Sequence, residues 1–348
     1  GSGVVRRAEA SVSYHRTRED ADRWSCTLGT ASADSIARCA ALEPALVARK
    51  RRSLDTVSTL GGQAEAELAF LRDRIRVTAG LDTYGDFVAS SLWSGRADEG
   101  FAMSAASRGN YTDGSRYLSL GAFVHGEVTL WDFGADVGRI VASGGPRVSH
   151  FRAQADDVPG LGDLAYAVTG VVGGASLQWV RPGLYTIYAS FDEGFRAPNL
   201  QETTVLGDTG DKFEIPNATL GPQRSDTIEG GVKVRLGWLD AAVAGFASFL
   251  SDLIDEQDAT WEGQSQVGGK NVKQRVNKQA GRYAGVEAAM KARWWRLTLD
   301  ASVAWMQGTV EAADGTTYPA RRIPPVAGRS GLRYDDPGHA FYIEGFVR

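Results

Sequence analysis

Apolar and polar side chains alternate along the chain with a period of two residues. Between Ser225 and Leu236 the even positions are mostly apolar, whereas the odd positions include Thr227, Glu229 and Lys233. The same alternation marks residues 74–84 and 296–306. Successive side chains of an extended strand point to opposite faces. Each segment therefore predicts a β-strand with one apolar face and one charged face.

Thirteen segments carry this pattern, although those near residues 134 and 238 alternate poorly. They cover residues 4–17, 55–71, 74–89, 117–130, 134–151, 170–181, 184–194, 225–236, 238–252, 281–293, 296–309, 326–335 and 339–348. Short turns, such as residues 72–73 and 294–295, separate some of them. Long links separate the others, at residues 18–54, 90–116, 152–169, 195–224, 253–280 and 310–325. Tight turns at one end and long loops at the other are typical of an outer-membrane barrel.

Strand length separates this prediction from soluble alternatives. A β-sandwich or a propeller also alternates apolar and polar residues, but its strands usually run about five or six residues. The segments here run about ten to fourteen residues, close to a tilted membrane-spanning strand. Four tryptophans stand at the short turns, where they would meet lipid headgroups or else cover the end of a soluble sheet: Trp131, Trp238, Trp294 and Trp295.

Charged residues in the middle of the segments indicate which face is which. They are Glu65, Glu67, Arg76, Glu127, Glu229, Lys233, Glu287, Lys291 and Asp300. An Arg or Lys that faces lipid at mid-depth costs about 2 to 4 kcal/mol. The charged face is therefore expected to line a wet or protein-filled lumen, and the apolar face to contact outer-membrane lipid.

Composition excludes several classes of protein. No apolar run approaches the roughly 18 residues of a transmembrane helix, and Gly makes up 42 of the 348 residues. The 38 basic and 42 acidic residues give a net charge of −4, which argues against a nucleic-acid partner. The four histidines show no metal-ligand spacing, and no Walker A loop or dinucleotide fingerprint is present. We therefore expect no enzymatic activity, no metal site and no cofactor.

Two cysteines, Cys26 and Cys39, lie thirteen positions apart in a polar segment. In an oxidising compartment they would close a local loop by forming a disulfide. Two free thiols are the alternative.

A more specific signal follows the segment 184–194. Residues 192–202 read Asp-Glu-Gly-Phe-Arg-Ala-Pro-Asn-Leu-Gln-Glu, which resembles a motif of TonB-dependent outer-membrane receptors located just above a strand on the extracellular side. Residues 220–230 resemble that family's Leu-x-Pro-Glu segment, with Gln223 in place of the usual Glu. Residues 283–287 resemble its Gly-x-Glu strand, and residues 322–334 its late hairpin. The resemblance covers residues from about 170 to 342.

This resemblance implies an all-β, antiparallel transmembrane β-barrel meander in the bacterial outer membrane. Such receptors import a scarce nutrient, such as a ferric siderophore, haem or cobalamin, with energy from the TonB complex. Their barrels have about 22 strands and a plugged lumen, whereas we find no plug domain and no TonB box before residue 4. Residues 1–348 are therefore expected to be an internal part of a barrel domain, which TonB reaches through a plug outside this chain. The alternatives are a passive porin or adhesin barrel, or an outer-membrane barrel hydrolase.

Two groups of residues are candidates for a site. Pro198 ends a strand, so the rim motif is expected to hold the turn or to contact the plug rather than the ligand. Its residues are Phe195, Arg196, Pro198, Asn199 and Glu202. Two basic stretches in the expected extracellular loops could attract an anionic siderophore or lipopolysaccharide phosphate, or could serve loop solubility alone. They comprise Arg49, Lys50, Arg51 and Arg52, and Lys270, Lys273, Arg275 and Lys278.

Overall fold

The protein forms one large antiparallel β-sheet. The computed structural model describes residues 4–26, 37–39, 41, 47–106, 109–158, 160–209, 211–312, 314–338 and 340–348. Among these residues, no helix is long and apolar enough to cross a membrane.

Thirteen strands form a meander in which each strand pairs with the next. They are β1 (Val5–Cys26), β2 (Val47–Phe70), β3 (Ile75–Arg96), β5 (Arg116–Asp132), β6 (Arg139–Val158), β7 (Gly162–Arg181), β8 (Tyr185–Arg196), β11 (Gln223–Arg235), β12 (Leu239–Asp258), β14 (Lys270–Trp294), β15 (Leu297–Glu311), β17 (Ala327–Asp335) and β18 (Tyr342–Val347). Each corresponds to one segment predicted from alternation, so the predicted all-β antiparallel meander is confirmed.

Short elements that the alternation did not predict lie in the long links. They are η1 (Ala97–Glu99), β4 (Ser104–Ala105), α2 (Leu200–Thr204), β9 (Gly207–Thr209), β10 (Lys212–Ile215), β13 (Gln266–Val267) and β16 (Thr317–Pro319). With the short strands, the sheet has 18 strands. Two to five residues are too few to show a period, which is why the sequence pattern missed them.

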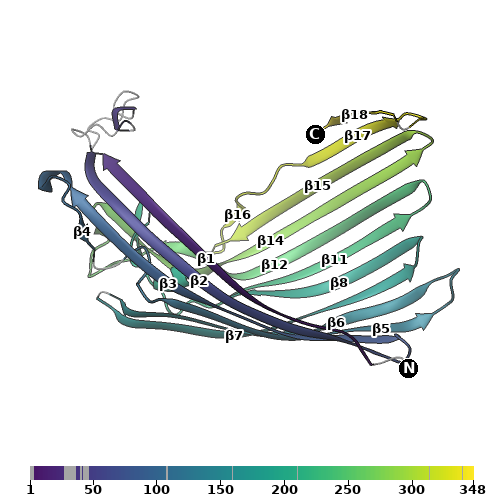
Figure 1. Cartoon of the computed structure of the whole chain (residues 1–348), viewed down its shortest axis with the longest axis horizontal. Coiled ribbons are helices and arrows are strands. Elements are labelled where there is room, and N and C mark those ends of the chain that lie inside the picture. The colour runs from purple at the N-terminus through teal and green to yellow at the C-terminus, as the bar shows by residue number, and fades with distance from the viewer. Residues whose placement is uncertain are drawn as a thin grey trace.

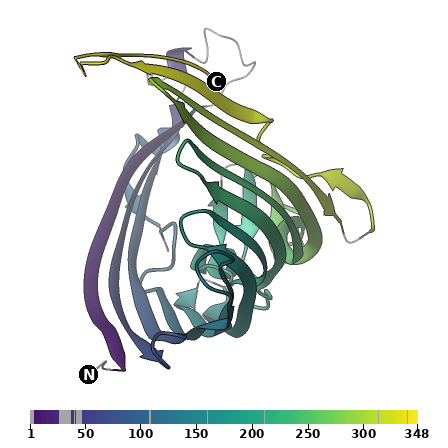
Figure 2. The ribbon, with the colours of Figure 1, turned by 90° about the vertical axis from the view of Figure 1, so that its right-hand side faces the viewer.

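The sheet is strongly curved and has two free edges. Among the described residues, β1 pairs only with β2, and β18 pairs only with β17. These edges lie apart, with the concave side of the sheet between them (Figure 2). The short turns gather at one end of the strands and the long links at the other (Figure 1).

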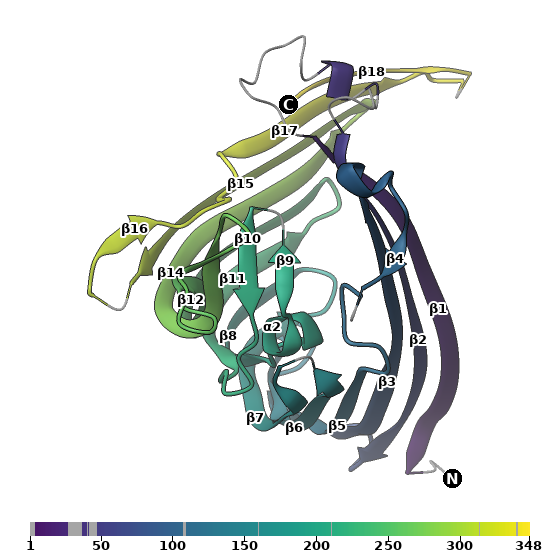
Figure 3. The same cartoon turned by 90° about the vertical axis from the view of Figure 1, so that its left-hand side faces the viewer.

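The strand register places the mid-strand charges together. Residues paired directly across a ladder share a face, and the strand pairings from β2 to β17 carry Glu65, Glu229 and Asp300 onto one face. The same face carries Val88, Ala153 and Tyr166, which pack against Leu200 of α2. Because α2 lies on the concave side (Figure 3), the charged face is the inner face.

The outer face is apolar and exposed. Val12 is 83% exposed, Leu81 63% and Val243 51%, which suits contact with lipid chains rather than water. The four predicted tryptophans at the short turns are also exposed, from 55% for Trp131 to 77% for Trp295. The opposed apolar and charged faces thus follow the predicted arrangement.

Aromatic rings on the inner face lie over glycines of the neighbouring strand. Phe246 is paired with Gly285, where an added Cβ would meet the ring at 2.7 Å. Phe123 is paired with Gly80, where the corresponding distance is 2.5 Å. Only glycine leaves room for a ring held flat against the sheet, an arrangement that also pins the register.

The strands continue farther than predicted at the long-link end. β1 ends at Cys26, β2 begins at Val47 and β14 begins at Lys270, whereas the predicted strands ended at residue 17 and began at residues 55 and 281. The basic stretches therefore lie on strands and not in loops, which corrects the prediction for Arg49, Lys50, Arg51, Arg52, Lys270 and Lys273. Beyond the apolar band both faces of a hairpin carry polar residues, so alternation ends although backbone pairing continues.

Candidate ligand-binding site

The rim motif closes on itself through hydrogen bonds. Both Nη atoms of Arg196 donate to the carboxylate of Glu202, each at 3.0 Å. Glu202 also accepts from the backbone N–H of Asn199, whose side chain accepts from the N–H of Glu202 at 2.8 Å. This reciprocal pair is a capping box, which satisfies N–H groups at the start of α2. The three polar side chains therefore hold the turn at the end of β8.

The motif directs the segment that contains α2, β9 and β10, which we call the inward segment, into the concave side of the sheet. Ala197 and Pro198 are buried, and Leu200 packs against Val88 and Tyr166 on the inner wall. Figure 3 shows α2, β9 and β10 within the hollow at the long-link end. Phe195 continues a row of rings on that wall, with its centroid 5.8 Å from that of Phe151.

An ion cluster fastens β10 to the start of β14, with which it pairs in parallel. Glu214 on β10 is 1% exposed and accepts from Arg275 at 2.5 Å. Arg275 also lies 2.8 Å from Glu256, which in turn bonds Lys212. A buried carboxylate is tolerated when it is paired and hydrogen-bonded. The cluster therefore anchors the inward segment to the β12–β14 hairpin.

The basic residues predicted as ligand-loop charges have different partners. Arg51 and Lys270 both face Asp208, at 3.7 and 3.4 Å. Lys273 pairs with Asp258 at 2.8 Å. Arg52 pairs with Asp20 at 2.8 Å, and the Lys50 ammonium lies 4.7 Å from the centre of the Trp24 ring. Arg51 lines a cavity at the long-link end.

That cavity, which we call the mouth cavity, has a volume of about 530 Å³ and opens at the long-link end. Its wall comes from the inner face of β1, β2 and β3, from residues 106 and 109–111, and from the inward segment at residues 205–209. Its charged and phenolic side chains are Glu19, Arg23, Arg51, Asp55, Tyr111 and Asp208. Except for Arg51, sequence reasoning missed these residues, because most of them lie in intervals expected to be loops.

Like charges face each other across β1 and β2 in the mouth cavity. Arg23 is paired directly with Arg51, and Glu19 with Asp55, an arrangement that is unfavourable without a counter-charge. Asp55 is already satisfied, because it accepts hydrogen bonds from Ser90 and, at 2.6 Å, from Asn110. Arg23 has no ion-pair partner among the described residues. The arginine pair is therefore the part of the cavity best suited to bind an anion.

Tyr111 adds a neutral donor to the same cavity. Burial raises the pKa of its phenol, and the negative charges of Asp55 and Glu19 raise it further. The hydroxyl therefore stays protonated at neutral pH. Among the described residues, no group of three or more His, Cys, Asp or Glu side chains could hold a metal ion.

Cys26, at the end of β1, is joined to Cys39 by a disulfide. The bond lies beyond the mouth cavity, three residues from Arg23.

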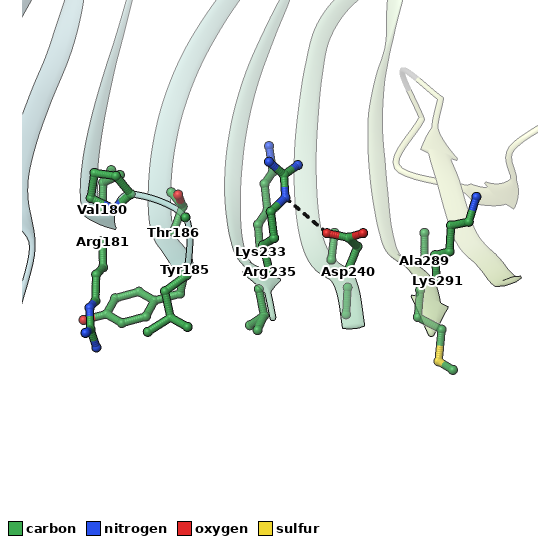
Figure 4. A pocket seen from close by; sticks show the side chains of 16 residues that line it. Val180, Arg181, Tyr185, Thr186, Lys233, Arg235, Asp240, Ala289 and Lys291 are labelled. Atoms are coloured by element: carbon green, nitrogen blue, oxygen red, sulfur yellow. Dashed lines mark hydrogen bonds and ion pairs between the residues drawn. The ribbon is translucent and has the colours of Figure 1, made fainter. Parts of the chain in front are cut away.

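A second cavity, of about 580 Å³, lies at the short-turn end of the sheet (Figure 4). Asp240 accepts from Arg235 at 3.1 Å and from Arg293 at 3.2 Å. Lys233 and Lys291 extend from neighbouring parts of the same wall. The one carboxylate among the lining residues, that of Asp240, already binds two guanidinium groups. This second cavity therefore carries a surplus of positive charge, at the opposite end of the strands from the mouth cavity.

Comparison with known proteins agrees with this architecture. The Copper transporter OprC has a TM-score of 0.67 and 19% sequence identity, over 95% of this chain and 47% of that chain. The hemophore receptor HasR of Serratia marcescens, solved with its hemophore HasA and heme, has a TM-score of 0.62 and 16% identity, over 97% and 58%. The ferric citrate transporter FecA has a TM-score of 0.60 and 12% identity, over 95% and 44%.

The chain thus spans about half the length of the solved structures it matches, which are transporters and receptors rather than enzymes. No curated protein sequence matches the chain. A family model described as "TonB dependent receptor-like, beta-barrel" matches residues 2–347. Since that match covers almost every residue, the protein belongs to the TonB-dependent receptor β-barrel family.

Proposed function

We propose that this chain is the barrel region of a bacterial outer-membrane receptor that imports a small metal chelate with oxyanion groups. The ligand class would be a ferric siderophore, haem or cobalamin, or a related chelate. The energy would come from the TonB complex through a plug domain outside this chain. The chain would act in transport and not as an enzyme.

The observation that carries the proposal is the paired arginines of the mouth cavity. Arg23 and Arg51 lie directly opposite each other on the inner face, at the end where the long links gather. Guanidinium groups bind carboxylates and other oxyanions through paired hydrogen bonds. Because Asp208 already lies 3.7 Å from Arg51, a bound anion would chiefly supply the counter-charge that Arg23 lacks among the described residues. The relatives named for transport of ferric citrate and copper support an import role.

Uptake in cells that express the complete natural protein tests this function. Accumulation of radioactive iron would be measured with ferric citrate, a ferric catecholate and a ferric hydroxamate, with and without a protonophore. We expect accumulation of at least one chelate to stop with the protonophore. Arg23→Gln and Arg51→Gln should each raise the KM for uptake about tenfold or more, because each removes a charged hydrogen bond.

Lys291→Gln provides a matched control, because it removes one inner-face cation at the opposite end of the strands. It should leave the KM for uptake unchanged. Accumulation that continues with the protonophore and ignores Arg23 and Arg51 would instead indicate a passive porin.

A further inference from the structure

Three arginines stand on the outer face just beyond the apolar band. They are Arg16 on β1, Arg116 on β5 and Arg152 on β6, and all three are exposed. Among the described residues, none of their guanidinium groups has an ion-pair or hydrogen-bond partner. We call these three residues the arginine patch.

The strand register brings the arginine patch together on one face. Arg16 is paired with Ser58, Ser58 with Phe87, and Phe87 with Arg116, so these residues form one row across the sheet. Neighbouring strands lie about 4.8 Å apart, which puts Arg16 and Arg116 on the order of 15 Å apart. Arg152 is paired with Leu118. It is therefore a diagonal neighbour of Arg116, about 7 to 8 Å away.

Exposed apolar side chains border the arginine patch on the side of the short turns. Tyr14 is 65% exposed and Leu118 39%, each two residues from an arginine on its own strand. Phe87, which lies in the row between Arg16 and Arg116, is 53% exposed. A ligand on this surface would meet guanidinium groups and apolar side chains at the same time, as a lipid headgroup and its acyl chains do.

Negative charge on the outer face does not neutralise the patch. On β1 the nearest carboxylate, Asp20, bonds Arg52 at 2.8 Å and lies 3.9 Å from Arg18. On β8 and β11 the corresponding surface is different, because Glu193 and Asp226 are paired there. The arginine patch thus lies in the sector from β1 to β6, away from this pair of carboxylates.

We propose that Arg16, Arg116 and Arg152 bind the phosphate groups of lipid A, the phosphorylated lipid of the outer leaflet. Arginine forms short, paired hydrogen bonds with phosphate oxygens, and basic residues at a membrane surface attract anionic headgroups. The inference rests on the outer-membrane location under the proposed function, but not on which ligand is imported.

The test is a lipid-binding titration of the complete protein in a neutral, phosphate-free detergent. The probes are bisphosphorylated lipid A and the same lipid after removal of both phosphates. We expect the phosphorylated form to bind at least tenfold more tightly. The R16Q/R116Q/R152Q variant should lose this preference, by about fivefold for each arginine. Salt should weaken the preference of the unchanged protein, because the patch is exposed.

The R23Q/R49Q/R51Q variant is the matched control, since it removes the same charge near the same end of the strands but from the inner face. It should keep the preference for phosphorylated lipid. Equal binding of the two lipids by the unchanged protein, or equal losses in the two triple variants, would overturn the inference. If the patch variant does not fold, R116Q and R152Q singly provide the same comparison.

Insertion into neutral phosphatidylcholine vesicles tests the outer-membrane location separately from lipid A binding by the arginine patch. A protein that inserts but shows no phosphate preference contradicts only the arginine patch. A protein that fails to insert contradicts the outer-membrane location itself.

Discussion

Single residues at the end of β8 decide where the following segment goes. Arg196 and Glu202 are six positions apart, and the bidentate bond between them bends the chain from the strand into α2. Glu202 is the shared member, because it also caps the first turn through Asn199. No other side chain of the motif can replace both bonds.

Glu202→Ala should therefore loosen the inward segment. It removes the partner of Arg196 and half of the capping box, and loss of such a cap costs about 1 to 2 kcal/mol. Hydrogen exchange of the amides at residues 199–205 should accelerate about tenfold, while exchange in β8 stays unchanged. Gln201→Ala is the control, because this neighbour is exposed and caps nothing. Equal acceleration in both variants would contradict the structural role of Glu202.

Whole strands were predictable where one of their faces is apolar. In β11, Ile228 and Val232 alternate with Glu229 and Lys233, and this contrast identified the strand and its inner face. The contrast disappears in the upper part of β2, where Arg49, Lys50, Arg51 and Arg52 follow one another. Both faces are polar there, so only the pairing with β1 and β3 maintains the strand.

The mouth cavity could not be predicted because its parts are distant in sequence. Asp208 meets Arg51 and Lys270 only after the segment between β8 and β11 turns inward. The parallel pairing of Lys212 with Asn271 has no local signal either. The rim motif was recognisable from its residues, but its place beside Tyr166 and Val88 depends on four separate elements.

A disulfide constrains the β1–β2 hairpin in addition to the pairing of its strands. Cys26 and Cys39 are paired, and a cross-link over 13 residues stabilises by about 3 kcal/mol in the chain-entropy description. In intact cells that express the complete protein, a membrane-impermeant maleimide should label neither cysteine until a reductant is added. Immediate labelling of the unreduced protein would contradict the pairing. A Cys26→Ser/Cys39→Ser variant, which should stay unlabelled throughout, gives the background.

At the scale of the whole molecule, the two faces of the sheet are expected to meet different surroundings. Val243 lies on the outer face and is 51% exposed, whereas its neighbour Ala244 lies on the inner face opposite Glu287. One position thus separates a site that is expected to face lipid from a polar one. A charge placed at each of them compares lipid with lumen within a single strand.

Val243→Arg should destabilise the membrane-inserted protein by about 2 to 4 kcal/mol, the cost of Arg on the lipid face at mid-depth. Ala244→Arg should cost less than about 1 kcal/mol, because the new guanidinium faces Glu287 and a wet lumen. Urea unfolding of the complete protein in phospholipid vesicles measures both free energies. Because the two variants add the same side chain to the same strand, only the surroundings differ. Equal costs would mean that the apolar face is not in lipid, and the outer-membrane location would then fail together with the assignment of inner and outer faces.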